Sequence, residues 1–256
     1  MLKLSVVIIT FNEEKNIGRC LESVRDIADE IIVVDSHSTD NTRLICEKYG
    51  VKFIEHDFEG YIQQKNYAIS QATFIHQLSL DADEALSDEL KNEIKKRKEN
   101  WDCDGYRMNR LANYCGKWIR YSGWYPDTKL RLYDSTKGEW HGVNPHDKFE
   151  MNRNSSLGFL KGDILHYTYY TVQEHIQQSE KFSTIAAREM MKHGKPVYFY
   201  KIILNPIAKF IRNYILHLGF LDGYYGFRIC GILTLETYKK YKKALHLQQL
   251  ERKKTF

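Results

Sequence analysis

Proline and repeats are scarce in this sequence. Its 256 residues include only four prolines, and we find no low-complexity run and no internal repeat of solenoid length. Long disordered segments and repeat architectures are therefore not expected. Hydrophobic residues make up 43% of the chain, which is enough for a substantial core, so the composition indicates one large domain or one domain with an extension.

The cysteines are few, and no pair of them has C-x-x-C spacing. They are odd in number: Cys20, Cys46, Cys103, Cys115 and Cys230. This pattern argues against a disulfide framework or a zinc site, and a reducing cytoplasm fits it best. We expect the cysteines to be small buried side chains.

Long apolar runs and glycine-rich loops are also missing. No segment has ~18 uncharged apolar residues, so no membrane-spanning helix is expected. The apolar run at 4–10 is followed at once by Asn12, Glu13 and Glu14, without a small-residue cleavage site. It therefore indicates a buried first strand rather than a signal peptide. Neither G-x-x-x-x-G-K nor G-x-G-x-x-G occurs, so a bound phosphate would have to be neutralised by a metal ion and basic side chains.

The charge is distributed unevenly along the chain. The formal net charge is +5, but residues 176–256 hold fifteen Lys and Arg against five Asp and Glu, and the rest of the chain holds 23 against 28. Residues 197–250 combine this positive charge with an amphipathic helical pattern, which predicts an anionic membrane surface as a partner. Packing on the main domain and formation of a homodimer are the alternatives. Nucleic-acid binding is not favoured, because the basic residues concentrate in a tail that is also apolar.

Strand and helix patterns alternate over the first hundred residues. Apolar runs predict strands at 4–10, 31–34, 51–55 and 74–80, and apolar residues at helical spacing predict helices at 17–28, 40–49, 61–72 and 88–98. This order predicts an α/β fold with a mostly parallel, doubly wound sheet flanked by helices. In such a sheet the loops that follow the strands share one edge, and ligands bind there.

The chain changes character after residue 100. Residues 100–170 are rich in Tyr, Trp, Gly and His. Their weak periodicity indicates short strands and long loops around a pocket for a polar ligand, or else a small aromatic core. Residues 172–193 look helical, and one or more further helices follow. We therefore predict a first domain over 1–171 and a basic helical extension over 172–256.

Three carboxylates follow the fourth predicted strand directly. They belong to Asp81, Asp83 and Glu84. Burying them together is costly unless a cation compensates their charge. A hard divalent ion, with oxygen ligands and substrate phosphates around it, is the natural partner. An acidic turn that caps the next helix is the alternative.

The first and second predicted strands end in polar residues at the same edge. Asp35 ends the second strand, where its carboxylate can accept hydrogen bonds from a nucleotide, and Thr10 and Asn12 follow the first strand. Capping of the next helix is the alternative role for the residues after Asp35. Three strand ends thus present polar groups to one site.

These segments occur as four blocks in order: SVVIITFNEEKNIGRCLESV, EIIVVDSHSTDNT, QQKNYAISQA and LSLDADE. Together they resemble glycosyltransferase family 2, the inverting enzymes with a GT-A fold. The later blocks WYPDTKLRL, GDILH and FLDGYYGF, together with the segment 140–147, resemble one branch of that family. That branch contains the lipopolysaccharide core β-glucosyltransferases that extend an inner-core heptose. The resemblance covers nearly the whole chain.

The resemblance implies roles in donor binding for particular residues. Thr10, Asn12 and Asp35 would hold the nucleoside, taken to be uridine, and Lys65 would assist nucleotide or phosphate binding. Asp81 would face the ribose or the metal. Asp83 would ligate Mg²⁺ or Mn²⁺, which would bridge the diphosphate.

A second set of roles concerns the leaving group and the acceptor. Lys129 and Arg131 are candidates for a second diphosphate clamp, or else a basic stripe on a strand. Inversion needs a general base for the acceptor hydroxyl, and the family places an acid late in the fold. The branch has His-Glu where this chain has His146-Asp147, so Asp147 is the expected base. Asp127 and Glu150 are the alternatives.

The resemblance implies an inverting, metal-dependent transfer of glucose from UDP-glucose to a lipid-linked saccharide such as lipopolysaccharide inner core. The enzyme would be cytoplasmic and peripheral at the inner face of the cytoplasmic membrane. A capsule, O-antigen or polyprenyl-linked acceptor is the alternative. A nucleotidyltransferase would normally have a glycine-rich basic loop after the first strand, which is absent here. A non-catalytic module that binds sugar nucleotide or lipid is the remaining rival.

Overall fold

The computed structural model describes residues 2–143, 146–193 and 197–254. The chain divides into two compact units. The first unit comprises Met1–Leu111 and Pro126–Tyr167, and the second comprises Ala112–Tyr125 and Thr168–Phe256. The first unit carries most of the sheet and the candidate site, and the second is mainly helical apart from a short hairpin at 112–119.

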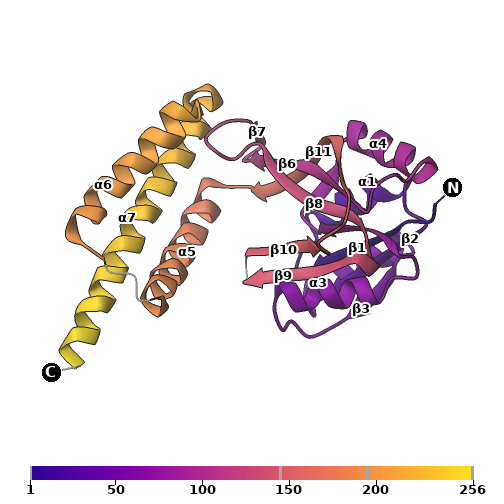
Figure 1. Ribbon diagram of the computed structural model, residues 1–256, viewed down its shortest axis with the longest axis horizontal. Helices are drawn as coiled ribbons and strands as arrows, with labels where there is room; N and C mark the ends of the chain where they lie inside the picture. The colour runs from indigo at the N-terminus through magenta and orange to yellow at the C-terminus, as the bar shows by residue number, and fades with distance from the viewer. Residues whose placement is uncertain (1, 144–145, 194–196, 255–256) are drawn as a thin grey trace. The chain divides into compact units, whose positions relative to one another are not determined.

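A mixed sheet forms the framework of the first unit (Figure 1). Its strands run in the order β3-β2-β1-β4-β8-β6-β11-β5, and β7 pairs with the end of β6 that belongs to the second unit. The strands are β1 (Ser5–Thr10), β2 (Glu30–Asp35), β3 (Lys52–Glu55), β4 (His76–Asp81), β5 (Glu84–Leu86), β6 (Gly105–Tyr114), β7 (Lys117–Ile119), β8 (Asp127–Asp134) and β11 (Leu157–Tyr169).

The parallel part of the sheet comes from the predicted strand–helix alternation. β3, β2, β1 and β4 pair in parallel. Beyond β4 the pairing changes, since β8 runs antiparallel to β4 and to β6, and β5 runs antiparallel to β11. The parallel arrangement of the first four strands thus does not continue into β8, because the segment after residue 100 supplies hairpins instead of crossover helices.

Helices cover both faces of the parallel strands. They are α1 (Ile17–Val24), α2 (Thr42–Lys48), α3 (Tyr61–Ser70) and α4 (Asp88–Glu99). Successive side chains of a strand point to opposite faces, so Val6 of β1 joins the core cluster that contains Leu21 of α1 and Leu90 of α4. Val7 joins a second cluster with Ala68 of α3. Burial on both faces explains the nearly continuous apolar run of β1.

A separate antiparallel pair lies beside α3 in this unit. It consists of β9 (Gly138–Val143) and β10 (His146–Met151). The Asn66 side chain holds it to α3: its amide donates to the Trp140 carbonyl at 3.0 Å and its oxygen accepts from the Trp140 amide at 2.9 Å. Phe149 stacks on Tyr133 of β8 with ring centroids 3.5 Å apart. These contacts position Asp147, which lies on β10.

The second unit is a set of packed helices. They are α5 (Val172–Lys192), α6 (Phe199–Phe210), a π-helical segment (Ile211–Leu216), a 3-10 turn (Gly219–Asp222) and α7 (Gly223–Lys254). α5 and α6 both pack against α7. The helices in the described ranges do not combine the length and the apolar character needed to cross a bilayer.

Asp222 ties the 3-10 turn to the loop after β7. Its carboxylate accepts hydrogen bonds from the amides of Arg120 and Tyr121 at 3.1 Å each and from the Ser122 hydroxyl at 2.9 Å. Three donors satisfy a carboxylate that is 3% exposed. The FLDGYYGF block therefore fixes the loop that residues 120–122 form within this unit.

Candidate functional site

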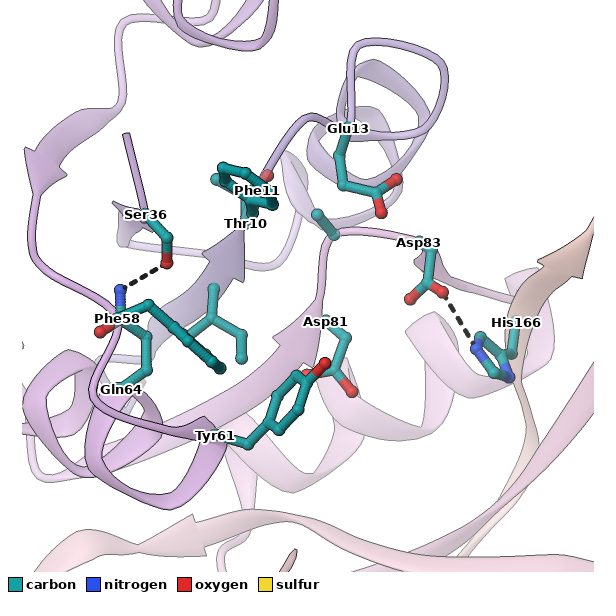
Figure 2. A pocket seen from close by; sticks show the side chains of 12 residues that line it. Thr10, Phe11, Glu13, Ser36, Phe58, Tyr61, Gln64, Asp81, Asp83 and His166 are labelled. Carbon is teal, nitrogen blue, oxygen red and sulfur yellow. Dashed lines mark hydrogen bonds and ion pairs between the residues drawn. The ribbon is translucent and has the colours of Figure 1, made fainter. Parts of the chain in front are cut away.

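A cavity of about 570 Å³ lies at the carboxyl ends of β1, β2 and β4. Parallel pairing brings these ends together, because Thr10 is in register with Asp35 and Ile9 with Asp81. The strand ends, the start of α3 and β11 all contribute side chains (Figure 2). Its polar and aromatic lining residues are Thr10, Phe11, Glu13, Ser36, Phe58, Tyr61, Gln64, Asp81, Asp83 and His166.

One side of the cavity offers groups that suit a nucleoside. The Thr10 hydroxyl is buried and has no hydrogen-bond partner within the described ranges. The Gln64 amide donates to the Ser36 hydroxyl at 3.1 Å. The rings of Phe11 and Phe58 are 56% and 50% exposed. A buried hydroxyl without a partner is costly, so a ligand that bonds to Thr10 and stacks on an aromatic ring would fit here.

The loops after β1 and β2 are fastened to each other by Asn12 and Asp35. Asn12 adopts φ 54°, its amide donates to the Ser38 hydroxyl at 2.7 Å, and its side-chain oxygen accepts from the Thr39 amide at 2.8 Å. Asp35 is 1% exposed and accepts from the Ser38 amide at 2.7 Å and its hydroxyl at 2.5 Å. Neither Asn12 nor Asp35 lines the cavity, so both act on it only through the loops that they hold together.

Asp81 is compensated by two buried basic side chains. Lys65 Nζ lies 3.0 Å from Asp81 Oδ1, and Arg131 Nη2 lies 3.0 Å from Asp81 Oδ2. Both basic side chains are 4% exposed. Burial alone would raise the pKa of Asp81, but the charges of Lys65 and Arg131 outweigh it and hold the pKa well below its usual range. Asp81 is therefore an ionised carboxylate within a protein ion-pair network.

Asp83 and His166 lie next to each other on another side of the cavity (Figure 2). His166 Nε2 lies 3.1 Å from Asp83 Oδ2, and the Tyr167 amide donates to the Asp83 carbonyl at 2.9 Å, which ties β11 to this turn. Burial lowers the pKa of His166, but the charge and hydrogen bond of Asp83 outweigh it, so the pKa is raised. Burial, with a smaller effect from Asp83, raises the pKa of Glu13 to about 7.

This side of the cavity fits a divalent cation that shares its shell with a ligand. Within the described ranges, no group of three His, Cys, Asp or Glu side chains is arranged to hold a metal by itself. Mg²⁺ is commonly held by one or two carboxylates, with phosphates and water as further ligands. Asp83 and His166 can supply such a partial shell.

A second cavity of about 390 Å³ adjoins the first, and Tyr61 and Asp81 line both. β8 and β10 provide much of its wall, through Lys129, Arg131 and Asp147 among others. Lys65 also lines it and donates to Asp147 Oδ2 at 2.7 Å. The Lys65 ammonium thus links the turn at residues 81–83, called the DAD turn below, to β10.

The alternatives to Asp147 as a base are held in other ion pairs. Asp127 pairs with Arg110 at 2.8 Å and with Lys129 at 2.9 Å, and Glu150 pairs with Lys148 at 2.7 Å. Neither Asp127 nor Glu150 lines either cavity. The side chain of His146 lies outside the described residues.

The structure distributes the predicted residues over two neighbouring cavities. Thr10 and Asp83 line the first, Lys65, Lys129, Arg131 and Asp147 line the second, and Asp81 lines both. No individual role was predicted for Phe58, Tyr61 and Gln64, although Gln64 lies in the QQKN block that carries part of the resemblance.

Comparison with known sequences gives a consistent picture. Residues 5–157 match the sequence model of a family described as glycosyl transferase family 2. The chain is 31% identical over 241 residues to an uncharacterised glycosyltransferase of Rickettsia typhi, with 89% of this chain and 81% of that protein covered. It is 30% identical over 226 residues to the lipopolysaccharide core biosynthesis glycosyltransferase LpsC of Rhizobium meliloti, with 83% and 81% covered.

The fold is also similar to that of solved structures. The mannosyltransferase PcManGT from Pyrobaculum calidifontis, in complex with GDP-Man and Mn²⁺, superposes with a TM-score of 0.55 at 16% identity. The match covers 95% of this chain and 87% of that one. Identity this low bears on the fold alone, and with the family match the predicted GT-A α/β class is confirmed.

Proposed function

This chain belongs to glycosyl transferase family 2, and we propose that it transfers a sugar from a nucleotide donor with inversion. The proposed donor is UDP-glucose, and the proposed acceptor is a lipid-linked saccharide such as lipopolysaccharide inner core. The similarity to LpsC, whose name places it in lipopolysaccharide core biosynthesis, supports this acceptor class. The observation that carries the proposal is the cavity where Thr10, Asp81, Asp83 and His166 meet.

The first cavity is the proposed donor site. The Thr10 hydroxyl bonds to the nucleoside, and Phe11 or Phe58 stacks on its base. Asn12 and Asp35 contribute by fixing the two loops that form the rim. The diphosphate lies toward Asp83 and His166, because a divalent cation held there would compensate the negative charge of both Asp83 and the diphosphate.

Asp83 and His166 would hold the divalent metal, Mg²⁺ or Mn²⁺. When bound, the metal would stabilise the charge that develops on the diphosphate as it leaves. Asp81 keeps its ion pairs with Lys65 and Arg131 and orients the turn that carries Asp83. It can also accept a hydrogen bond from the ribose.

Asp147 is the proposed general base. In an inverting transfer, the acceptor oxygen attacks the anomeric carbon while the bond to the diphosphate breaks, and the acceptor proton passes to the base. Asp147 lines the cavity next to the donor site, where an acceptor can reach the donor sugar. Lys65 holds the Asp147 carboxylate at 2.7 Å and so sets its position.

The helical unit is the proposed membrane-binding part. Along α6 and the π-helical segment, a stripe of apolar side chains is more than half exposed: Phe199, Tyr200, Ile203, Leu204, Ile207, Ile215 and Leu216. Lys201, Lys209 and Arg212 lie on the same stretch of chain. Anionic lipid attracts each nearby basic residue by about 1 kcal/mol, so an inner-leaflet surface at the cytoplasmic membrane is the proposed partner. A homodimer through the same stripe is the alternative outcome.

Release of UDP from a panel of UDP-sugars, with Mg²⁺ or Mn²⁺ and with EDTA, tests the transferase proposal. We expect metal-dependent hydrolysis of one donor, with a rate lowered by about a hundredfold or more in Asp83→Ala. Asp147→Asn should retain donor binding and lose transfer once an acceptor is supplied. No turnover and no metal-dependent UDP binding would contradict the proposal.

A further inference from the structure

The second cavity is lined by more basic than acidic side chains. Five of its lining residues are basic and two, Asp81 and Asp147, are acidic. The basic residues are Lys65, Arg110, Lys129, Arg131 and Lys148. Lys65 forms ion pairs with both acids. The other four are each paired with an acid as well, so they bring hydrogen-bond donors rather than uncompensated charge to a space of about 390 Å³.

Acids outside the lining hold these basic groups in place. Glu84, which is 1% exposed, pairs with Arg131 and with Arg110 at 3.2 Å each. Asp127 pairs with Lys129 at 2.9 Å, and Glu150 pairs with Lys148 at 2.7 Å. Such pairs orient the cations while leaving part of their hydrogen-bonding capacity unused, since a guanidinium has five N–H donors and an ammonium has three.

Arg131 shows this unused capacity most directly. Its side chain is 4% exposed, and Nη2 donates to Asp81 and Glu84. Nε and Nη1 are buried without a hydrogen-bond partner in the part of the chain that the structure describes. The Trp140 ring lies 5.2 Å from the guanidinium carbon, which offsets only part of the desolvation. Buried donors without acceptors are costly, so this wall is suited to an anionic ligand.

The position of the cavity indicates which substrate the ligand belongs to. This step rests on the proposed function. Thr10, Asp83 and His166 line the first cavity and not the second, so the nucleoside and the metal-bound diphosphate are assigned to the first. Asp147, the proposed base, lines only the second. A saccharide whose hydroxyl reaches Asp147 must place its neighbouring groups against Lys129, Arg131 and Lys148.

We propose that the second cavity binds an anionic group of the acceptor, a phosphate or a carboxylate, so that the enzyme takes an acidic sugar in preference to a neutral one. The anion accepts hydrogen bonds from Arg131 and pairs with Lys129 and Lys148, and it fixes the distance between the reacting hydroxyl and Asp147. A neutral sugar would leave the Arg131 donors without acceptors.

Monosaccharide probes test this proposal in the full-length protein with saturating UDP and Mg²⁺. The probes are methyl glucoside, mannose 6-phosphate and glucuronate, and the measurement is the dissociation constant of each by ligand-observed NMR. We expect at least one acidic sugar to bind about tenfold or more tightly than the neutral one. Preference for the phosphate or for the carboxylate identifies the group, and either supports the proposal.

Two variants connect the preference to the cavity. Lys129→Met and Lys148→Met should each reduce it about threefold or more. Lys137→Met removes a 45% exposed lysine that pairs with Asp104 away from both cavities, and it should leave the preference unchanged. Arg131 is left intact because of its buried pairs.

Four results would overturn the inference. Equal binding of acidic and neutral sugars, or no binding of any probe, while UDP still binds with metal, would overturn it and leave the proposed function standing. Weakened UDP binding in Lys129→Met would assign the cavity to the donor diphosphate instead. Absence of UDP binding in the parent would reject the proposed function together with the inference.

Discussion

Replacing Arg131 with methionine tests how the DAD turn is stabilised. The guanidinium pairs with Asp81 at 3.0 Å and with Glu84 at 3.2 Å, and its side chain is 4% exposed. Methionine fills a similar volume without the charge. In the variant, Glu84 would keep Arg110 and Asp81 would keep Lys65, but each carboxylate would lose one of its two cations.

The expected cost follows from burial. Removing one partner of a buried ion pair typically destabilises a protein by about 3–5 kcal/mol, because the remaining charge stays in a low-dielectric environment with less compensation. The matched control is Lys129→Met on the same strand. Lys129 pairs with Asp127, and both side chains are about one-third exposed at 35% and 33%, so its loss should cost at most about 1 kcal/mol.

Native-state hydrogen exchange measures the stability of each unit separately, so it suits this test. A loss of about 3–5 kcal/mol corresponds to exchange that is roughly 150-fold to several-thousand-fold faster for the most protected amides of β4. The double variant with Glu84→Gln should recover part of the loss, because the pair is removed from both sides. Less than about tenfold faster exchange in Arg131→Met would refute the assignment of Arg131 as a buried counter-ion.

Two further predictions concern the helical unit. The double variant Ile203→Glu with Ile207→Glu should bind vesicles that contain phosphatidylglycerol more than about tenfold more weakly, because two apolar side chains no longer enter the membrane interface. Leu44→Glu, at an exposed position outside the helical unit, is the control. If the double variant bound the vesicles as strongly as this control, the membrane proposal would be contradicted. Burial lowers the pKa of His175 from 6.5 to about 4. Below pH 6.5 the unfolded state therefore binds a proton that the folded state binds only near pH 4. The free energy of unfolding should fall by up to about 3 kcal/mol as the pH drops through that window. If a His175→Phe variant kept this pH dependence in thermal unfolding, the pH dependence could not be assigned to His175.

The parallel half of the fold could be predicted because its signals are local. Each predicted strand of the first hundred residues is a short apolar run, and each helix shows its own spacing. Burial on both faces of β1, with Val6 on one side and Val7 on the other, explains why that run is continuous. Ligands bind at the carboxyl ends of parallel strands, and this rule alone predicted that Thr10, Asp81 and Asp83 would share one site.

The antiparallel part and the second cavity could not be predicted in this way. β8 lies between β4 and β6 in the sheet, and no periodicity in the sequence encodes that order. The ion pair between Lys65 and Asp147 joins residues 82 positions apart. Asp35 shows a different limit, since its strand-end position was predicted, but its engagement by Ser38 depends on the conformation of the following loop.

Calorimetric titration of UDP into the full-length protein tests the central claim most directly, which is that the strand-end cavity binds a metal–nucleoside diphosphate. We expect UDP to bind in the presence of Mn²⁺, and the affinity to fall by about tenfold or more with EDTA or in Asp83→Ala. Asp88→Ala, an exposed acid at the start of α4, should bind UDP as the parent does. Binding of equal strength with and without metal, or an Asp83→Ala variant that binds like the parent, would contradict the account.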